Sequence, residues 1–372
     1  MLIGSEFYSY LQQKGIEFTT GVPDSLLKEF CAFISDQGND IIAANEGASI
    51  GIAAGYHLAT GKIPMVYMQN SGFGNTINPI TSLADKEVYS IPMLLVVGWR
   101  GEPGVKDEPQ HVKQGRVSEG LLDTLEIPYE VLSNDINEAQ KQIDKAVDYM
   151  SAENAPFALL IRKNTFEKYS LKNKKADIYP MQREDAIKVV IDACKNDEII
   201  VSTTGKTSRE VFECRVANGQ GHENDFLTVG SMGHASQIAL GIALQKPNKP
   251  IICLDGDGAM LMHLGSTAII GDLSPANYKH ILINNGAHDS VGGQPTVGFD
   301  VNFQQIAEAC NYKKCFTATN EAELKAILPE FLSTNGPVML EIKTSKGARA
   351  DLGRPTKTPT QNKADFMKKL SE

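Results

Sequence analysis

The sequence predicts an α/β protein with two doubly wound domains, each built on a mainly parallel sheet of six strands. Helical and strand patterns alternate along the chain, and the strand segments are nearly continuous in apolar residues. Parallel strands have this composition because helices cover both faces of their sheet. The alternation stops near residue 163 and restarts near residue 187. The length of 372 residues is enough for two domains of ordinary size.

The alternation is clearest in the first half of the chain. Apolar residues spaced i, i+3, i+4 and i+7 from Leu27 mark one face of a helix. Short apolar segments that we expect to be strands are residues 41–44, 65–68, 93–97, 129–132 and 157–161. Together with a strand that ends near Gly21, they make roughly six strands with helices between them.

A lysine-rich stretch is expected to separate the two domains. Residues 163–180 hold five lysines and little apolar periodicity, which is typical of an exposed linker. We therefore assign residues 1–165 to the first domain, 166–181 to a linker and 182–372 to the second domain. The strand candidates of the second half are residues 199–202, 251–254, 281–283, 315–317 and 338–342.

The residues after about Lys343 turn polar and show no core pattern. On composition alone, a solvated C-terminal tail is the favoured interpretation. The alternative is a segment that folds over a site and brings Arg349 or Arg354 to an anion.

Composition and charge exclude several classes of protein. Hydrophobic residues make up 42% and charged residues 22%, as in a soluble globular protein. The net charge of −9 argues against a nucleic-acid partner and means that an anionic substrate needs local positive charge. The six cysteines form no C-x-x-C pair, so free thiols are expected. Without a signal-peptide pattern or a long apolar run, we expect a cytoplasmic protein with no membrane partner.

Two predicted strand ends carry the strongest functional signal. Asp257 stands between two glycines at the end of one strand, and Asn284 and Asn285 end the next. The 25 residues 259–283 suit one crossover helix and a return strand, so both ends lie at the same edge of the sheet. Oxygen ligands beside glycines suit Mg²⁺ bound to a diphosphate. The helix after Gly258 would point its free N–H groups at the same phosphate.

Gly-Asp-Gly, 25 residues and then Asn-Asn resembles the cofactor motif of thiamine diphosphate (ThDP)-dependent 2-oxo acid decarboxylases. The resemblance implies the ThDP-binding fold, with a pyrimidine-binding first domain and a diphosphate-binding second domain. Many members insert a third domain, for which the short linker leaves no room. The implied cofactors are ThDP and Mg²⁺, the cation being held by Asp257, Asn285 and the backbone carbonyl of Ala287. The residues expected at the cofactor in this half are Gly230, Ser231, Met232, Gly256, Asp257, Gly258, Ala259 and Asn285.

Glu46 lies where a predicted strand meets a helix rich in small residues. An acidic residue at a helix start is common, because the helix dipole favours it. The resemblance implies a catalytic role, since the family places here a Glu that bonds the pyrimidine ring and activates the cofactor. Met232 matches the bulky apolar residue that supports the bent cofactor, although an isolated Met is usually core filler.

Loops after the strands supply further candidates. Asp24 and Ser25 could cap the next helix or help its N-terminus to bind a substrate anion. His111 ends the charged loop 99–111 and could relay a proton after CO₂ leaves, or be an ordinary surface histidine. The weaker substrate candidates of loop 286–296 are His288, Asp289 and Gln294.

The stretch Thr204-Gly205-Lys206-Thr207 imitates a phosphate-binding P-loop. That motif needs a glycine five residues before Gly205, where Ile200 stands, so a P-loop NTPase is excluded. The stretch still follows a predicted strand, and it could hold a cofactor phosphate or simply start a helix.

Within the family, five stretches between residues 21 and 355 are similar to the branch that decarboxylates phosphonopyruvate, with the sulfopyruvate branch as close kin. They are Gly-Val-Pro-Asp-Ser, Asp-Glu-Pro-Gln-His, Thr-Gly-Lys-Thr-Ser-Arg-Glu, Asn-Asn-Gly-Ala-His-Asp-Ser-Val-Gly-Gly-Gln-Pro-Thr and Asp-Leu-Gly-Arg-Pro. The resemblance implies conversion of 3-phosphonopyruvate to phosphonoacetaldehyde and CO₂ in phosphonate biosynthesis, for example that of 2-aminoethylphosphonate.

Two alternatives stay open for the function. One is a decarboxylase or carboligase that acts on sulfopyruvate or another small anionic 2-oxo acid. The other is a ThDP-binding protein without turnover, against which the presence of both Glu46 and the metal motif argues. The family builds each site between the pyrimidine domain of one chain and the diphosphate domain of another. The resemblance therefore implies a homodimer or a larger homo-oligomer.

Overall fold

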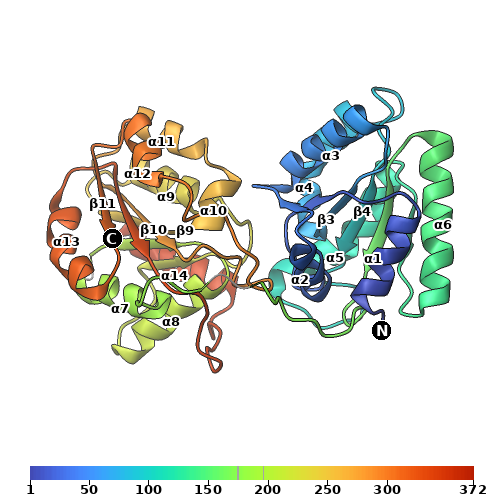
Figure 1. The fold of residues 1–372 in the computed structure, drawn as a ribbon. Coiled ribbons are helices and arrows are strands. Elements are labelled where there is room, and N and C mark those ends of the chain that lie inside the picture. The colour runs from blue at the N-terminus through green and yellow to red at the C-terminus, as the bar shows by residue number, and fades with distance from the viewer. Residues whose placement is uncertain (174–175, 196) are drawn as a thin grey trace. The chain divides into compact units, whose positions relative to one another are not determined.

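A computed structural model describes residues 1–173, 176–195 and 197–372. The chain divides into two compact units, residues 1–174 and 175–372. Each unit holds one six-stranded parallel sheet with helices on both sides (Figure 1). The predicted fold class is therefore confirmed, and the described residues form no third unit. The predicted linker 166–181 includes Lys174 and Lys175, which lie outside the described residues.

The first unit has the strand order β2-β1-β3-β4-β6-β5. Its strands are β1 (Thr19–Gly21), β2 (Asp40–Ile42), β3 (Met65–Gln69), β4 (Leu94–Gly98), β5 (Tyr129–Val131) and β6 (Phe157–Ile161). Its helices are α1 (Gly4–Gln13), α2 (Lys28–Gln37), α3 (Glu46–Thr60), α4 (Phe73–Pro79), α5 (Pro109–Thr124) and α6 (Ile136–Glu153). In this order β2 is added on one side of β1, and β3 and the later strands are added on the other side. Ligands of such sheets bind at this switch point between β1 and β3.

Two hydrophobic cores flank the first sheet, because neighbouring residues of a strand point to opposite faces. Tyr67 of β3 packs with α1, α2 and α6, whereas Val66 and Met68 pack with α3, α4 and α5. Phe166 belongs to the first of these cores and pairs with Leu2 in an isolated β-bridge. Part of the lysine-rich stretch that we expected to be exposed is therefore buried.

The second unit has the order β11-β12-β10-β9-β7-β8, which repeats the first order when it is read from β8. Its strands are β7 (Ile199–Ser202), β8 (Asp225–Leu227), β9 (Ile251–Gly256), β10 (Tyr278–Asn284), β11 (Lys314–Ala318) and β12 (Val338–Lys343). Its helices are α7 (Arg183–Ala193), α8 (Lys206–Ala217), α9 (Ala235–Gln245), α10 (Asp257–Met262), α11 (Ser266–Leu273), α12 (Phe303–Ala309), α13 (Glu321–Ser333) and α14 (Pro359–Ser371).

The edge strand β8 was not among the predicted strands. It has three residues and starts with a charged one, so it gives no apolar run. Asp225 is buried there because the guanidinium of Arg215 donates to both of its carboxylate oxygens, at 3.0 and 2.9 Å. This ion pair is formed between residues of α8 and β8, and neither residue predicts it alone.

The C-terminal segment is not the solvated tail that its composition favours. Helix α14 starts with a capping box at Thr358, and its Phe366 is buried in the core beside β8. The side chain of Asn362 donates to Asp225 O at 2.8 Å and accepts from Leu227 N at 3.1 Å. These bonds satisfy backbone groups of an edge strand, so α14 protects the end of the sheet.

The cysteines are as expected, because all six are free and four of them are buried. Among the described residues, no helix is long and apolar enough to cross a membrane.

Candidate cofactor site

Asp257 is the first residue of α10 and follows β9 directly. Its side chain is 3% exposed and accepts a hydrogen bond from the hydroxyl of Thr296. Burial raises the pKa of Asp257 to about 6, and hydrogen bonds from Thr296 and the Asn285 backbone oppose this rise. A desolvated carboxylate gains strongly from a bound cation, so this position suits a metal ligand.

Asn284 and Asn285 follow one another at the end of β10, and a carboxylate orients each side chain. Nδ2 of Asn284 donates to Glu341 Oε1 at 2.8 Å, and Nδ2 of Asn285 donates to Asp289 Oδ2 at 2.9 Å. An ionised carboxylate only accepts, so each amide must turn its oxygen away from it. Oδ1 of Asn285 accepts from Ala287 N at 3.1 Å and keeps capacity for a second partner.

Loop 286–296 and the residues after it close over these strand ends. Ala287 and Pro295 form an antiparallel bridge, which folds the loop back on itself. A Cβ on Gly298 would lie 2.5 Å from Asp257 Oδ2 and 2.7 Å from Asn284 Oδ1. Oxygen donors from both strand ends therefore gather within a few ångströms, and this donor set fits Mg²⁺.

Three segments converge beside Gly258. A Cβ at this position would lie 3.2 Å from the ring of His288 and 3.3 Å from Met232 Cε. Burial lowers the pKa of His288 to about 4, so its ring is neutral at pH 7. Gly233 has a φ of +87°, and a Cβ there would meet Ala259 O at 3.0 Å. The absence of these two side chains lets the loop that carries Met232 approach α10 closely.

The remaining candidates of this unit lie around the same edge. Gly230 and Gly256 are half-buried, whereas Ser231 is exposed and its hydroxyl lies 3.1 Å from His234 Nδ1. A Cβ on Gly205 would lie 2.8 Å from Ser290 Oγ, so the turn that imitates a P-loop contacts loop 286–296.

Gln294 is fully buried, yet neither polar atom of its side chain has a hydrogen-bond partner among the described residues. Its backbone oxygen accepts from His288 N at 2.8 Å. Buried amides nearly always have hydrogen-bond partners. A ligand group that bonded to Gln294 would therefore offset the free-energy cost of burying its amide.

In the first unit, Glu46 is the first residue of α3 and is 6% exposed. Its Oε2 accepts from Asn75 Nδ2 at 2.7 Å. A Cβ on Gly72 would lie 2.5 Å from Glu46 Cγ, so glycine is what allows this close approach. The sequence did not single out Asn75 or Gly72, because nothing local connects them with a residue almost thirty positions earlier.

Asp24 does not cap α2, which begins after Leu27 without a side-chain cap. The capping interpretation was therefore wrong for this residue. The buried carboxylate accepts instead from Leu26 N at 2.8 Å and from Gln69 Nε2 at 2.5 Å. It ties the end of β1 to the end of β3. The neighbouring Ser25 accepts from Arg100 Nη1 at 2.5 Å.

His111 is a buried residue of α5, not an exposed surface histidine. Its Nδ1 lies 3.0 Å from Asp107 Oδ1, which fixes the proton on Nδ1 and leaves Nε2 for another partner. Arg100 donates to both oxygens of Asp107. Burial opposes ionisation of Asp107, but hydrogen bonds from Arg100 and His111 hold its pKa well below its usual range. A cavity of about 730 Å³ is lined by Ser25, Arg100, Lys106 and Asp107 among others.

The two C-terminal arginines lie in acidic or exposed surroundings. Arg349 pairs with Glu184 at 3.0 Å, with Asp351 at 3.1 Å and with Glu213. Its charge is therefore already matched, which disfavours the alternative in which it binds a substrate anion. Arg354 is exposed.

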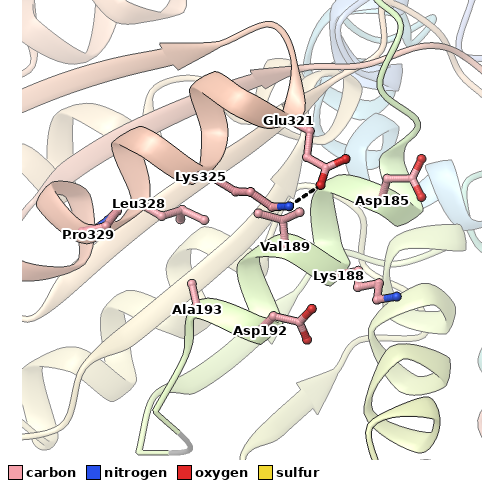
Figure 2. A pocket seen from close by; sticks show the side chains of 9 residues that line it. All are labelled: Asp185, Lys188, Val189, Asp192, Ala193, Glu321, Lys325, Leu328 and Pro329. Carbon is pink, nitrogen blue, oxygen red and sulfur yellow. Dashed lines mark ion pairs between the residues drawn. The ribbon is translucent and has the colours of Figure 1, made fainter.

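A second cavity, of about 530 Å³, lies between α7 and α13 (Figure 2). Its side chains include the ion pair of Lys325 and Glu321, at 2.5 Å, with Asp185 and Asp192 nearby. It contains none of the residues that the sequence analysis selected, and its mixed charges indicate no particular ligand.

Comparison with known proteins agrees with this geometry. The N-terminal TPP-binding domain of thiamine pyrophosphate enzymes matches residues 1–124, and their C-terminal TPP-binding domain matches residues 203–342. A phosphonopyruvate decarboxylase of Streptomyces viridochromogenes is 31% identical over 97% of this chain and 93% of its own. A sulfopyruvate decarboxylase of Methanosarcina acetivorans is 28% identical over 81% of this chain and 80% of its own.

A further relative is the sulfopyruvate decarboxylase subunit beta of Methanocaldococcus jannaschii, 37% identical over 42% of this chain and 87% of its own. The matches to both TPP-binding domains confirm ThDP as the cofactor, and the oxygen donors at the ends of β9 and β10 fit a cofactor that binds through a metal ion. The chain belongs to the family of thiamine pyrophosphate enzymes.

Proposed function

We propose that this chain is a ThDP- and Mg²⁺-dependent decarboxylase that converts 3-phosphonopyruvate to phosphonoacetaldehyde and CO₂. One observation carries the proposal: similarity to a phosphonopyruvate decarboxylase extends over 97% of the chain and includes both halves of the candidate site. A buried carboxylate is available in the first unit at Glu46, and oxygen donors are available in the second at Asp257 and Asn285.

When bound, ThDP supplies the electron sink that takes up the electron pair left behind as CO₂ departs from a 2-oxo acid. Asp257, Asn285 and the carbonyl of Ala287 would hold Mg²⁺ together with diphosphate oxygens. Met232 and Gly258 would contact the rings, with Gly230, Ser231, Gly256 and Ala259 around them.

Glu46 would hold a proton at the pyrimidine nitrogen, with Asn75 fixing its carboxyl group from the other side. A buried carboxyl group exchanges a proton with a bonded ring nitrogen without competition from water. This is the task that the family assigns to the position.

The reaction consumes one proton, because the bond to the departing carboxylate is replaced by a C–H bond. His111 is our candidate for delivering it. Asp107 holds Nδ1, so Nε2 is the ring nitrogen that is left to face a substrate. Asp107 is itself held by Arg100, which gives the ring a fixed orientation.

Several loop residues are proposed to choose the substrate. Ser25 and Lys106 line the cavity of the first unit and offer a hydroxyl and a positive charge to an anionic group, whereas Arg100 is already paired with Asp107. In the second unit, Gln294 offers an amide that has no hydrogen-bond partner among the described residues, and the ring of His288 lies beside Gly258. Asp24, Arg349 and Arg354 are weaker, since Asp24 and Arg349 already have partners and Arg354 is exposed.

Sulfopyruvate is the second candidate substrate, because a sulfopyruvate decarboxylase is 28% identical over 81% of this chain. Both substrates are 2-oxo acids with a tetrahedral anionic group, so the shared site residues do not separate them. The test is to measure kcat/KM for CO₂ release from phosphonopyruvate, sulfopyruvate and pyruvate by the purified chain with ThDP and Mg²⁺. We expect phosphonopyruvate to be preferred. A clear preference for sulfopyruvate would replace the proposed substrate while leaving the reaction class intact.

We also propose that the chain works as a homodimer or a larger homo-oligomer, the arrangement that the family implies for its sites. Sedimentation at the concentrations used in the assay tests this. An active monomer would contradict it.

A further inference from the structure

Asp289 lies at the centre of a partly buried hydrogen-bond network beside the metal-ligand candidate Asn285. One oxygen of its carboxylate, Oδ2, accepts from Asn285 Nδ2 at 2.9 Å and from Arg183 Nη1 at 2.9 Å. The same oxygen accepts from Gly347 N, also at 2.9 Å. Three donors on one oxygen leave the Asp289 carboxylate little freedom to turn.

Arg183, the first residue of α7, fixes the Asp289 carboxylate by donating a hydrogen bond to it. Its guanidinium is buried, with the side chain 6% exposed. It donates to both oxygens of Glu210 in α8, at 2.6 and 2.8 Å, and to Gly347 O at 3.0 Å. Paired donors fix a guanidinium in one plane, so the nitrogen that reaches Asp289 has a defined position.

We infer that Asp289 is a positioning residue, which makes Asn285 present its amide oxygen, and not its NH₂ group, to the cation. The inference rests on the proposed function only in requiring that Mg²⁺ and ThDP bind here. The physical reason is that a carboxylate accepts and does not donate, so the Asn285 NH₂ must face Asp289. The opposite side of the amide is then the oxygen.

Without Asp289, the Asn285 amide keeps the bond from Ala287 N at 3.1 Å but loses the acceptor of its NH₂ group, so rotation by half a turn becomes easier. The rotated amide would point N–H groups with partial positive charge at the cation and lose a ligand. Groups that orient metal ligands in this way typically contribute about 10- to 100-fold to metal affinity.

The test is a double-mutant cycle read out as Mn²⁺ affinity, measured by electron paramagnetic resonance on the full chain with saturating ThDP. Asp289→Ala should weaken Mn²⁺ binding about 10- to 100-fold. Asn285→Ala should weaken it at least as much. The double variant should bind Mn²⁺ no more weakly than Asn285→Ala alone, because Asp289 acts through Asn285.

Asp192→Ala is the matched control. Asp192 also accepts from an asparagine amide, Nδ2 of Asn218 at 2.8 Å, but it lies on the exposed face of α7. Its removal should leave Mn²⁺ affinity unchanged. If Asp289→Ala does not fold, Asp289→Leu keeps about the same size without an acceptor and replaces it in the same cycle.

The inference is overturned if the Asp289 variant binds Mn²⁺ within about threefold of the wild type, or if the two single effects multiply in the double variant. It is also overturned if the wild type binds no Mn²⁺ with ThDP. A wild type that binds Mn²⁺ and ThDP but releases no CO₂ from phosphonopyruvate contradicts the proposed function and leaves the role of Asp289 standing.

Discussion

The third and fourth strands along each unit end side by side, but the side chains that follow them differ in charge and in what they can bind. In the second unit, Asp257 and Asn285 follow β9 and β10 and offer oxygen atoms. In the first unit, β3 and β4 are followed by Asn70 and Arg100. The Asn70 side chain donates to Arg100 O at 2.8 Å and accepts from Arg100 N at 3.2 Å, so these two strand ends are bonded directly to each other.

The difference teaches that the shared topology places the loops and does not decide what they bind. Both sheets have the same strand order, and both collect several loops at one edge. Acidic and amide side chains there suit a cation, whereas Arg100 with its partner Asp107 brings a guanidinium to the other unit. The same strand order therefore carries oxygen atoms at this edge in one unit and a paired guanidinium in the other.

A second comparison concerns the two buried carboxylates that begin helices. Glu46 begins α3 and accepts from one neutral amide, Asn75 Nδ2. Asp257 begins α10 and accepts from Thr296 and from backbone N–H groups. We propose that Glu46 exchanges a proton and that Asp257 binds a cation. Four predictions test these two comparisons.

The largest effect is expected for Glu46→Gln, which keeps the size of the side chain but cannot donate a proton as a carboxyl group does. CO₂ release should fall about 10²- to 10⁴-fold, while the affinity for Mg²⁺ and ThDP stays within a few-fold of the wild type. The matched control is Glu138→Gln, another acidic residue in the first turn of a helix, which is exposed. Near-normal turnover in Glu46→Gln would remove Glu46 from the chemistry.

Asp257→Ala should instead lose affinity for the cation, because it removes the charged cation ligand. Affinity for Mg²⁺ in the presence of ThDP should drop by more than about 100-fold, beyond the usual effect of residues that only orient ligands. Titration calorimetry measures this drop directly. The rise in melting temperature that Mg²⁺ and ThDP give the wild type should disappear as well. Retained affinity would refute the metal role.

Asp107→Asn tests the network of the first unit through stability. Its carboxylate accepts from Arg100 and His111 and from the backbone of Gly101 and Glu108, so the free energy of unfolding should fall by about 1–3 kcal/mol. The lowered pKa gives the sign of the pH dependence. The stabilisation is present above the ordinary value of 3.8 and is lost as pH falls below it.

Urea unfolding between pH 7 and pH 3 measures both effects. The difference between the wild type and Asp107→Asn should shrink as the pH is lowered. A difference that stays constant would show that the carboxylate is not the source of the stabilisation.

The smallest effect is expected for Asn45→Ala. The Asn45 side chain caps α3 by accepting from Ala48 N at 2.9 Å, and such a cap typically contributes about 1 kcal/mol. Helix α10 has no equivalent, because Gly256 precedes it. Thermal unfolding should show the loss, and CO₂ release per folded molecule should change little. A large loss of turnover would mean that the cap also sets the position of Glu46.

Much of the fold could be predicted because each buried parallel strand is a short apolar run in the sequence, such as residues 93–97. The second-unit motif could be predicted because a sheet edge brings Asp257 and Asn285 together. Contacts between distant segments could not. Gly72 beside Glu46, and Arg183 behind Asp289, depend on tertiary packing that no sequence window contains. Helix α14 was missed because its packed face holds few apolar residues, Phe366 and Leu370, beside the polar Asn362.

The most direct test of the proposed function is the stoichiometry of the reaction. The purified chain is given phosphonopyruvate, with ThDP and Mg²⁺ together and with each left out, and CO₂ and phosphonoacetaldehyde are quantified. We predict equal amounts of the two products, formed only when both ThDP and a divalent cation are present. A chain that binds Mg²⁺ and ThDP but forms neither product from phosphonopyruvate would contradict the proposed function.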